Sequence, residues 1–451
     1  MFRASLVGCL SCCFILLPVG HARARAADED KQKAPLPNIV VIFADDLGYG
    51  DLGCFGHPTI ATPNLDRMAR EGVRLTQFYV AECVCTPSRA ALLTGRLPIR
   101  NGMCSDTRRV LFSDSTGGLP EAEITIAELL KTKNYATACV GKWHLGHLPQ
   151  FLPMRQGFDS YYGIPYSNDM KPTYLLRGAQ VIEDPVDQTT LTARYTAEAE
   201  SFIRQQRDGP FFLYFPHTFP HVPLFASEKF QGKSRRGLFG DAVEELDWSV
   251  GQVLDTLREL EIEKQTLVFF TSDNGPWLIK NQDGGSAGLL RGGKGSTWEG
   301  GMREPAIAWW PDTIPAGRVS SELGCTTDLL ATINALVDVP LPTDRTLDSF
   351  DIRPVLLGTG PSPRKSLLYY RGRQLMAARA GPWKAHFMTQ AGYRQPQPEK
   401  HDPPLLFNLE NDPAEKYDLA QDHADVIAQI RKLVSEHEAG LDAPPSQLEL
   451  R

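Results

Sequence analysis

The chain has 451 residues, of which 42% are hydrophobic and 22% are charged, a balance typical of folded proteins and not of disordered ones. Its length predicts more than one domain and allows a large hydrophobic core. The formal net charge of −7 argues against nonspecific binding to nucleic acid, so we expect no nucleic-acid partner.

The first 26 residues have the layout of a secretory signal peptide. Arg3 provides a positive start, an apolar stretch follows over 4–19, and Ala24-Arg25-Ala26 offers a small-x-small cleavage site. This stretch is too short to span a membrane, and no later segment has roughly eighteen uninterrupted apolar residues, so we expect no stable membrane insertion. The sequence thus predicts a signal peptide over 1–26 and a protein that is secreted or periplasmic after cleavage.

Strands and helices alternate along the next part of the chain. Continuous apolar runs predict buried strands at 38–44, 136–140, 211–215 and 267–271. Helix start and stop signals predict helices from Pro63 to Gly72, from Thr125 to about Asn134, and over 243–260. This alternation predicts an α/β fold with a large, mostly parallel sheet sandwiched by helices.

The composition changes around residues 358–363, where glycine and proline are frequent. The elements expected beyond this point are two short strands, a loop rich in Pro and Gln, and a closing helix, at 366–370, 376–379, 395–404 and 424–437. We therefore expect a larger domain over 27–360 and a smaller C-terminal α+β domain with an antiparallel sheet over 361–451.

Chemically active side chains directly follow four of the predicted strands. In chain order they are Asp45 and Asp46, Lys142 and His144, His217 and His221, and Asp273 and Asn274. Ligands of open parallel sheets bind beyond the carboxyl ends of the strands, so we expect these groups to meet at one edge. The three aspartates and the asparagine offer only oxygen ligands, which suit Ca²⁺ or Mg²⁺ better than zinc. Taken singly they are ordinary turn residues, and only their recurrence after two strands favours a metal site.

Cys85 comes directly before an apolar helical run. Pro87 and Ser88 place it at a helix N-terminus, where free N–H groups favour an anion, and Arg89 follows four residues on. A lone cysteine is more often a small core residue, but a cysteine in this setting is a better nucleophile candidate. The residues alone therefore predict an anion-binding, metal-assisted site that contains a reactive cysteine position.

These motifs, in this order, resemble the sulfatase family, and within it most closely the arylsulfatase A type. CTPSR at 85–89 resembles the signature in which the cysteine is oxidised to Cα-formylglycine. The resemblance continues through NIVVIFADDLGYGDLG, GKWHLG, GIPYSND, TSDNGP and GKGSTWEGGMREPAIAWWP. It implies an alkaline phosphatase-like fold and a sulfuric ester hydrolase for aryl or carbohydrate sulfates, with 27–360 as the catalytic domain.

The resemblance also implies roles for individual residues. The ligands of a Ca²⁺, with Mg²⁺ as an alternative, would be Asp45, Asp46, Asp273, Asn274 and the modified Cys85. Arg89 and Lys142 would hold the formylglycine hydrate, and His144 would be its base. The groups that contact the sulfate would be Lys142, Ser167, His221 and Lys294. His221 is preferred to His217 because its spacing from the strand at 211–215 matches the family pattern.

The implied partners are a sulfated small molecule or sulfated glycan as substrate, and a formylglycine-generating or sulfatase-maturing enzyme that acts on Cys85. The leaving alcohol would take a proton from His221 or Lys294, and the hydrate's second hydroxyl would allow sulfate to be expelled. A serine at this position could attack sulfur but would lack that second hydroxyl.

Three other interpretations compete with this one. Gly288 to Lys294 imitates a phosphate-binding loop, but Gly295 stands where that motif needs Ser or Thr. A phosphodiesterase or phosphonate monoester hydrolase of the same superfamily would share the metal and the sheet, although such enzymes often use two metals and only one ligand set is visible. A non-catalytic sulfoglycan-binding relative would usually have lost one of these groups.

Overall fold

The computed structural model describes residues 1, 8–10, 35–393 and 397–451. The predicted cleavage site and most of the predicted signal peptide lie outside the described residues. All the elements described below belong to the unit Leu36–Arg451. No helix in this part of the chain is both long enough and apolar enough to cross a membrane.

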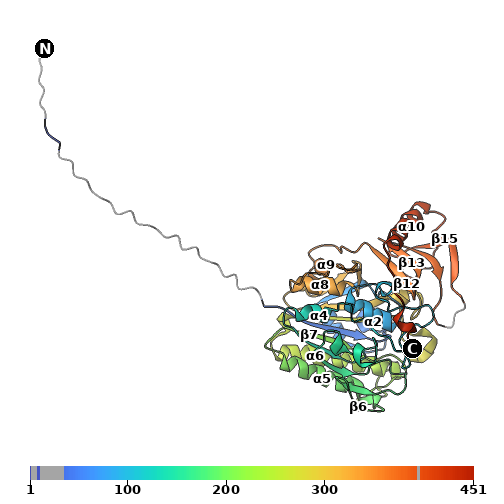
Figure 1. The fold of residues 1–451 in the computed structure, drawn as a ribbon. Coiled ribbons are helices and arrows are strands. Elements are labelled where there is room, and N and C mark those ends of the chain that lie inside the picture. The colour runs from blue at the N-terminus through green and yellow to red at the C-terminus, as the bar shows by residue number, and fades with distance from the viewer. Residues whose placement is uncertain (2–7, 11–34, 394–396) are drawn as a thin grey trace. The chain divides into compact units, whose positions relative to one another are not determined.

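A large mixed sheet lies at the centre of this unit (Figure 1). Across the described residues its strands lie in the spatial order β10 (Arg318–Ser320), β2 (Val73–Tyr79), β9 (Arg303–Trp309), β8 (Thr266–Ser272), β1 (Asn38–Ala44), β7 (Phe211–Pro216), β3 (Ala136–Val140), β4 (Ser160–Gly163), β5 (Leu175–Arg177) and β6 (Gln180–Glu183), with β11 (Gly324–Cys325) paired to β2. β1 is parallel to both neighbours, so that Val41 lies opposite Tyr214 and Phe269. β9 runs antiparallel to β2 and β8, and β5 runs antiparallel to β4 and β6.

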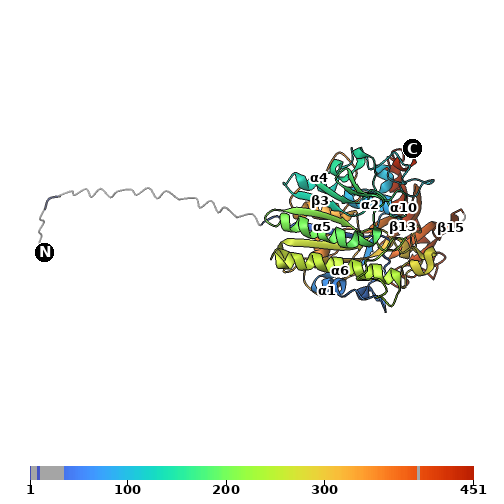
Figure 2. The same cartoon turned by 90° about the horizontal axis from the view of Figure 1, so that it is seen from below.

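Helices cover both faces of this sheet. α2 (Cys85–Thr94), α4 (Ile126–Lys131) and α8 (Asp328–Leu336) lie on one face, and α1 (Pro63–Glu71), α5 (Leu191–Gln205) and α6 (Leu238–Glu259) on the other (Figures 1 and 2). Alternate residues of β1 enter the two hydrophobic cores, Val41 on the α2 side and Val40 on the α6 side. A strand buried on both faces needs a continuous apolar sequence, which explains the run at 38–44.

The strands predicted from apolar runs correspond to β1, β3, β7 and β8, and the predicted sandwich of sheet and helices is confirmed. α1 begins at Pro63 and has Gly72 as its C-cap. α4 has the predicted capping box, in which Thr125 Oγ1 accepts the Glu128 N–H (3.2 Å) and Glu128 accepts the Thr125 N–H (2.8 Å). α6 begins at Leu238, earlier than its amphipathic pattern indicates.

The C-terminal part of the chain forms a second, antiparallel sheet. Its strands are, in order, β12 (Ser366–Arg371), β13 (Gln374–Ala380), β14 (Trp383–Thr389) and β15 (Glu399–Asn408), with α10 (Ala424–Ala439) packed against it. The predicted antiparallel sheet is confirmed, but the loop predicted over 395–404 is wrong from Glu399 onward, because β15 begins there. Pro403 and Pro404 are tolerated because β15 is an edge strand with an irregular register.

The second sheet adjoins the segment that precedes α2. An isolated parallel bridge joins Glu82 to Tyr370 of β12. One hydrophobic cluster also combines residues of this segment, such as Ala81 and Cys83, with Leu367 and Ala377 of the second sheet. The segment leading to Cys85 is therefore held by both sheets.

The remaining α-helices in the part of the chain that the structure describes are α3 (Pro98–Asn101), α7 (Glu299–Met302) and α9 (Arg353–Leu357).

Candidate active site

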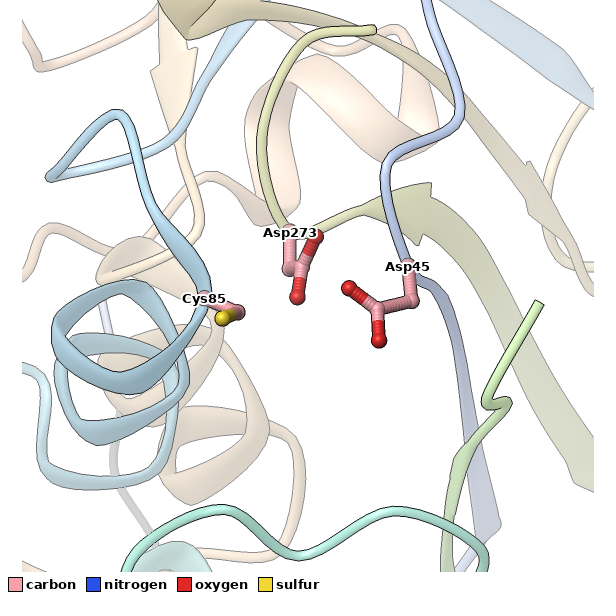
Figure 3. A group of neighbouring side chains, drawn as sticks. All are labelled: Asp45, Cys85 and Asp273. Atoms are coloured by element: carbon pink, nitrogen blue, oxygen red, sulfur yellow. The ribbon is translucent and has the colours of Figure 1, made fainter. Parts of the chain in front are cut away.

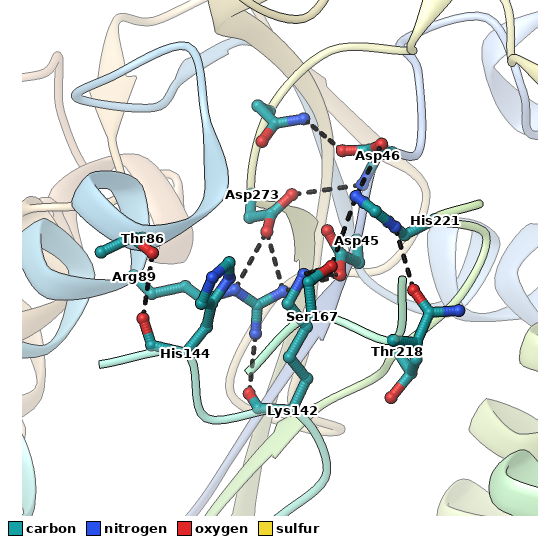
Figure 4. A network of polar contacts seen from close by, with 12 residues as sticks. Asp45, Asp46, Thr86, Arg89, Lys142, His144, Ser167, Thr218, His221 and Asp273 are labelled. Carbon is teal, nitrogen blue, oxygen red and sulfur yellow. Dashed lines mark hydrogen bonds and ion pairs between the residues drawn. The ribbon is translucent and has the colours of Figure 1, made fainter. Parts of the chain in front are cut away.

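The predicted site residues meet at the carboxyl ends of four neighbouring strands (Figure 4). The turns after β1, β3, β7 and β8 and the start of α2 contribute Asp45, Asp46, Lys142, His144, His221, Asp273, Asn274, Cys85 and Arg89. Ser167 and Lys294 join them from longer loops. All eleven side chains are buried. For the rest of this article we call this set the strand-end cluster.

Within the strand-end cluster each aspartate faces a cation. Arg89 donates from Nε and Nη2 to Asp273 Oδ2 (3.0 and 2.7 Å), Lys142 Nζ donates to Asp45 Oδ2, and Lys294 Nζ lies 2.6 Å from Asp46 Oδ1. Burial raises the pKa of Asp273 to about 7, and the nearby Asp45 carboxylate adds to this. Burial alone would also raise the pKa of Asp45, but Lys142 and the other cations hold it well below its usual range.

Three oxygens of the strand-end cluster accept no hydrogen bond from any described residue. They are Asp45 Oδ1, Asp46 Oδ2 and Asn274 Oδ1. A buried acceptor without a partner is costly, and buried carboxylates are normally paired or coordinate a metal. Asp45, Cys85 and Asp273 point into a common space, with one ligand atom from each lying within 4.8 Å of the others (Figure 3). The carboxylate and amide oxygens of this set fit a hard divalent cation, whereas an unmodified Cys85 would offer a soft sulfur.

The thiol of Cys85 is buried at the start of α2. Cys85 starts α2, where the free N–H groups favour a thiolate, yet it is only 2% exposed. Burial raises its pKa to about 11, although Lys142 and Lys294 oppose the change. The unmodified thiol is therefore not favoured as a thiolate, and the role of Cys85 stays a prediction.

His144 is held as a neutral base. Its Nε2 lies 2.9 Å from the carbonyl of Leu111, which can only accept, so Nε2 carries the proton and Nδ1 has a free lone pair without a partner. Burial lowers the pKa of His144 well below its usual value, and the charge of Lys142 lowers it further. Thr86, which the sequence did not single out, donates to the His144 carbonyl (3.1 Å) and accepts the Leu111 N–H (3.2 Å).

The structure brings His221, and not His217, into the strand-end cluster. His221 Nε2 lies 3.5 Å from Ser167 Oγ and 3.7 Å from Asp46 Oδ2, whereas His217 contacts Ser249 of α6. Asn168 was also missed from the sequence. Its Oδ1 accepts from His221 Nδ1 (3.0 Å), which fixes the ring. The only sequence signal for Asn168 is its place directly after Ser167.

Two glycines allow the strand ends to approach so closely. Gly141 has φ +127°, and a Cβ there would lie 1.9 Å from the carbonyl oxygen of Pro216. A Cβ at Gly163 would lie 1.7 Å from the carbonyl oxygen of Gly141. Only glycine fits at either position. The close approach lets the Lys142 N–H donate to Pro216 (2.7 Å), which directs the lysine into the cluster.

A second buried group of charges supports the loop that carries Lys294. Lys384 of β14 donates to the Thr297 carbonyl (2.8 Å) and contacts Glu299 (2.9 Å) and Glu415 (3.0 Å). The other carboxylate oxygen of Glu415 accepts the N–H of Glu299 (2.7 Å). We call Glu299, Lys384, His386 and Glu415 the inter-sheet cluster. No local sequence pattern indicated it.

The fold and the strand-end cluster define a hydrolase of the alkaline phosphatase-like class, built to bind an anionic ester among cations beside an oxygen-rich site. The family model "Sulfatase" matches residues 37–339, and "C-terminal region of aryl-sulfatase" matches 362–451. The chain is 44% identical to Arylsulfatase A of Homo sapiens, over 91% of this chain and 90% of that protein. It is 43% identical to N-acetylgalactosamine-6-sulfatase of Canis lupus familiaris, over 91% and 88%. The crystal structure of PsFucS1 sulfatase from Pseudoalteromonas sp. has a TM-score of 0.84 and 31% identity, covering 91% of each chain.

The chain therefore belongs to the sulfatase family and is an enzyme that hydrolyses sulfate esters. The predicted family, fold class and reaction are confirmed. The domain boundary near residue 360 and the roles of individual residues stay predictions.

Proposed function

We propose that this sulfatase releases sulfate from sulfated glycans or aryl sulfates, using a formylglycine made from Cys85 and a Ca²⁺ held by Asp45, Asp46, Asp273 and Asn274. The observation that carries this proposal is the set of buried oxygens without partners at the strand ends, beside Cys85 and among three cations. A substrate sulfate is an anion that needs such cations, and a Ca²⁺ is a cation that needs such oxygens.

The metal site would be formed by the three open oxygens together with Asp273 and residue 85. When bound, the Ca²⁺ would polarise the nucleophilic oxygen and neutralise charge on the sulfuryl group. Asn274 Nδ2 donates to Asp46 Oδ1 (2.8 Å), which orients its own Oδ1 away from that contact and leaves it available. Mg²⁺ has the same ligand preference and remains an alternative occupant.

The modification would solve the problem posed by the Cys85 thiol, whose pKa burial raises to about 11. As its hydrate, a formylglycine at position 85 would supply one hydroxyl to attack sulfur and a second whose deprotonation allows sulfate to leave. His144 would accept the proton of that second hydroxyl at Nδ1, the ring nitrogen without a partner. Arg89 and Lys142 would hold the hydrate, and Lys142, Ser167, His221 and Lys294 would contact the sulfate.

Two groups lie where the leaving alcohol would need a proton. Lys294 carries N–H donors on its ammonium group and contacts Asp46. His221 is fixed by the bond from its Nδ1–H to Asn168 and turns Nε2 toward Ser167; burial and Lys294 lower its pKa, so to act as the acid it would first have to bind a proton at Nε2. We propose one of these as the general acid, and a leaving-group series described below separates them from a purely electrostatic role.

The wider setting follows from the same proposal. The sugar sulfate named in N-acetylgalactosamine-6-sulfatase favours a sulfated glycan as the substrate class. A formylglycine-generating or sulfatase-maturing enzyme would be the required partner, and the predicted signal peptide favours a secreted or periplasmic location.

The decisive test is mass spectrometry of the peptide that spans Cys85, from enzyme with measured turnover of 4-nitrocatechol sulfate. We expect the aldehyde at position 85, and loss of turnover in Cys85→Ala. Fully active enzyme with an intact thiol would overturn the formylglycine proposal. Faster turnover of an aryl phosphate or phosphonate ester than of the aryl sulfate would favour the rival phosphodiesterase or phosphonate hydrolase.

A further inference from the structure

A polar cavity of about 280 Å³ lies next to the strand-end cluster and has no part in the proposed mechanism. Its lining includes Asp106, Arg109, Arg371, Gln374 and Gln390. Arg371 ends β12 and Gln374 begins β13, so the second sheet forms part of this cavity. The arginine and glutamine side chains among them are hydrogen-bond donors.

Both arginines are attached to the segments that carry site residues. Arg371 Nε donates to the carbonyl of Gly295 (2.8 Å), the residue that follows Lys294. Arg109 Nη2 lies 3.6 Å from Cys83 Sγ and 3.7 Å from Glu82 Oε1, on the segment leading to Cys85. The cavity therefore adjoins the two segments that carry Lys294 and Cys85.

An aromatic wall connects the two places. The Trp277 ring lies 5.3 Å from the His221 ring and 5.6 Å from the Tyr393 ring, and Lys294 Nζ lies 4.5 Å from its centre. Tyr393 packs against the hydrophobic cluster that contains Cys85. The charges of Lys294 and Arg109 both act on the pKa of Tyr393, although burial dominates and raises it. Tyr393 thus lies beside Trp277 and near Cys85, and the wall offers a surface for a sugar ring.

The cavity carries more positive than negative charge. Arg109 and Arg371 both line it; burial lowers the pKa of Arg371, and the charge of Arg109 lowers it further. Arg109 Nε has no hydrogen-bond partner among the described residues. Of the acids nearby, Glu82 is buried with a raised pKa, and Asp106 Oδ1 already accepts the N–H of Arg373 (2.8 Å). An anion between the arginines would satisfy these groups.

We infer that this cavity is a subsite for a second anionic group of the substrate, a sulfate or a carboxylate on the same or the neighbouring sugar. This inference rests on the proposed function, because it takes the cleaved sulfate to lie between Lys142 and Lys294. It narrows the substrate class to multiply anionic glycans. Paired guanidinium groups suit both anions, because a sulfate or a carboxylate can accept two parallel N–H bonds from one arginine.

The test measures the inhibition constants of glycan fragments against hydrolysis of 4-nitrocatechol sulfate by the modified enzyme. Three fragments are compared: one with a single sulfate, one with two sulfates, and one with a sulfate and a uronate carboxylate. We expect the best doubly anionic fragment to bind roughly tenfold or more tightly than the monosulfated one, and the two arms identify the preferred anion. Arg109→Gln should remove this preference and leave the inhibition constant of the monosulfated fragment unchanged.

Arg371→Lys provides a second variant. Lysine keeps the positive charge but cannot donate two parallel N–H bonds to one anion, so the preference for doubly anionic fragments should fall only in part. Arg108→Gln is the matched control: Arg108 directly precedes Arg109, pairs with Asp114 and does not line the cavity, so the preference should persist. Equal inhibition by all fragments in the wild type, or equal weakening of all of them in Arg109→Gln, would overturn the subsite. Wild-type enzyme that carries the aldehyde but hydrolyses no sulfate ester would instead contradict the proposed function.

Discussion

The strand-end cluster and the inter-sheet cluster are both buried and both rich in charge, yet they differ in how their carboxylates are satisfied. In the inter-sheet cluster Glu299 accepts from Lys384 (2.9 Å) and Tyr79 (2.6 Å), and Glu415 accepts from His386 (2.6 Å) and the Glu299 N–H (2.7 Å). In the strand-end cluster three oxygens of Asp45, Asp46 and Asn274 have no such partner among the described residues.

This difference distinguishes a cluster that supports the backbone, the inter-sheet cluster, from one that can bind a ligand, the strand-end cluster. Burial and charge are common to both clusters, so neither property identifies the place of chemistry. A network whose carboxylate oxygens are all paired holds backbone in position, here the loop with Lys294. A network that leaves acceptors open needs a ligand to complete it, because unpaired buried oxygens are costly.

The largest effect is expected for Cys85, the proposed source of the nucleophile in the strand-end cluster. Cys85→Ala should lower kcat/KM for 4-nitrocatechol sulfate by roughly 10⁴-fold or more, because the nucleophile is removed. In Cys85→Ser the serine hydroxyl should attack sulfur once and the enzyme should then stall as the serine sulfate ester, since a serine lacks the second hydroxyl, and the sulfated peptide should be visible by mass spectrometry. Repeated turnover by Cys85→Ser would contradict the proposed release step.

The next effect tests the inter-sheet cluster as a support. Lys384→Met leaves Glu299 and Glu415 buried without their shared cation, so the free energy of unfolding should fall by about 3–5 kcal/mol in denaturant titration. The increase in melting temperature caused by Ca²⁺ should stay as in the wild type. Loss of that increase would show that the two clusters are not separate in function.

A smaller effect tests the open oxygens. Ca²⁺ at one hundred times its dissociation constant should stabilise the wild type by about 2.7 kcal/mol, measured as a rise in melting temperature over metal-free enzyme. Asp46→Asn should reduce the rise, because it replaces a charged ligand by a neutral one, whereas Glu415→Gln is the matched control and should retain it. An unchanged rise in Asp46→Asn would argue against the strand-end cluster as the metal site.

The smallest effect concerns the orientation of His221. Asn168→Ala removes the acceptor of the His221 Nδ1–H, and we expect roughly a tenfold loss in kcat. If His221 protonates the leaving alcohol, the loss should be greater for sugar sulfates than for 4-nitrophenyl sulfate, which needs no proton. The same comparison with Lys294→Ala tests the other candidate acid, and an equal loss for both esters would assign that residue an electrostatic role only.

The sequence was sufficient to predict the central strands and the residues that follow them. Apolar runs such as 38–44 are diagnostic because a strand buried on both faces cannot be polar. The residues after such strands converge at one edge of the sheet, so Asp45 and Asp273 could be expected to meet although they are far apart in the chain.

Other features depend on tertiary contacts that leave no local signal. β15 contains two prolines, and only its position at an edge makes it a strand. Lys384 lies in β14 and Glu299 begins α7, far apart in the chain, so their pairing cannot be read from either segment. The pKa of Cys85 also depends on tertiary contacts. Its position at a helix N-terminus favours a thiolate, but its burial in the folded chain favours the thiol.

The burial of Cys85 also has a consequence for the order in which the chain is modified and folds. A residue that is 2% exposed at the start of a covered helix is out of reach of another enzyme's active site. Oxidation of Cys85 would therefore have to precede folding. In the folded chain the Glu82–Tyr370 bridge also joins the segment before Cys85 to β12, which lies far later in the sequence. Under the proposed function, the enzyme must therefore acquire its nucleophile before this segment is packed.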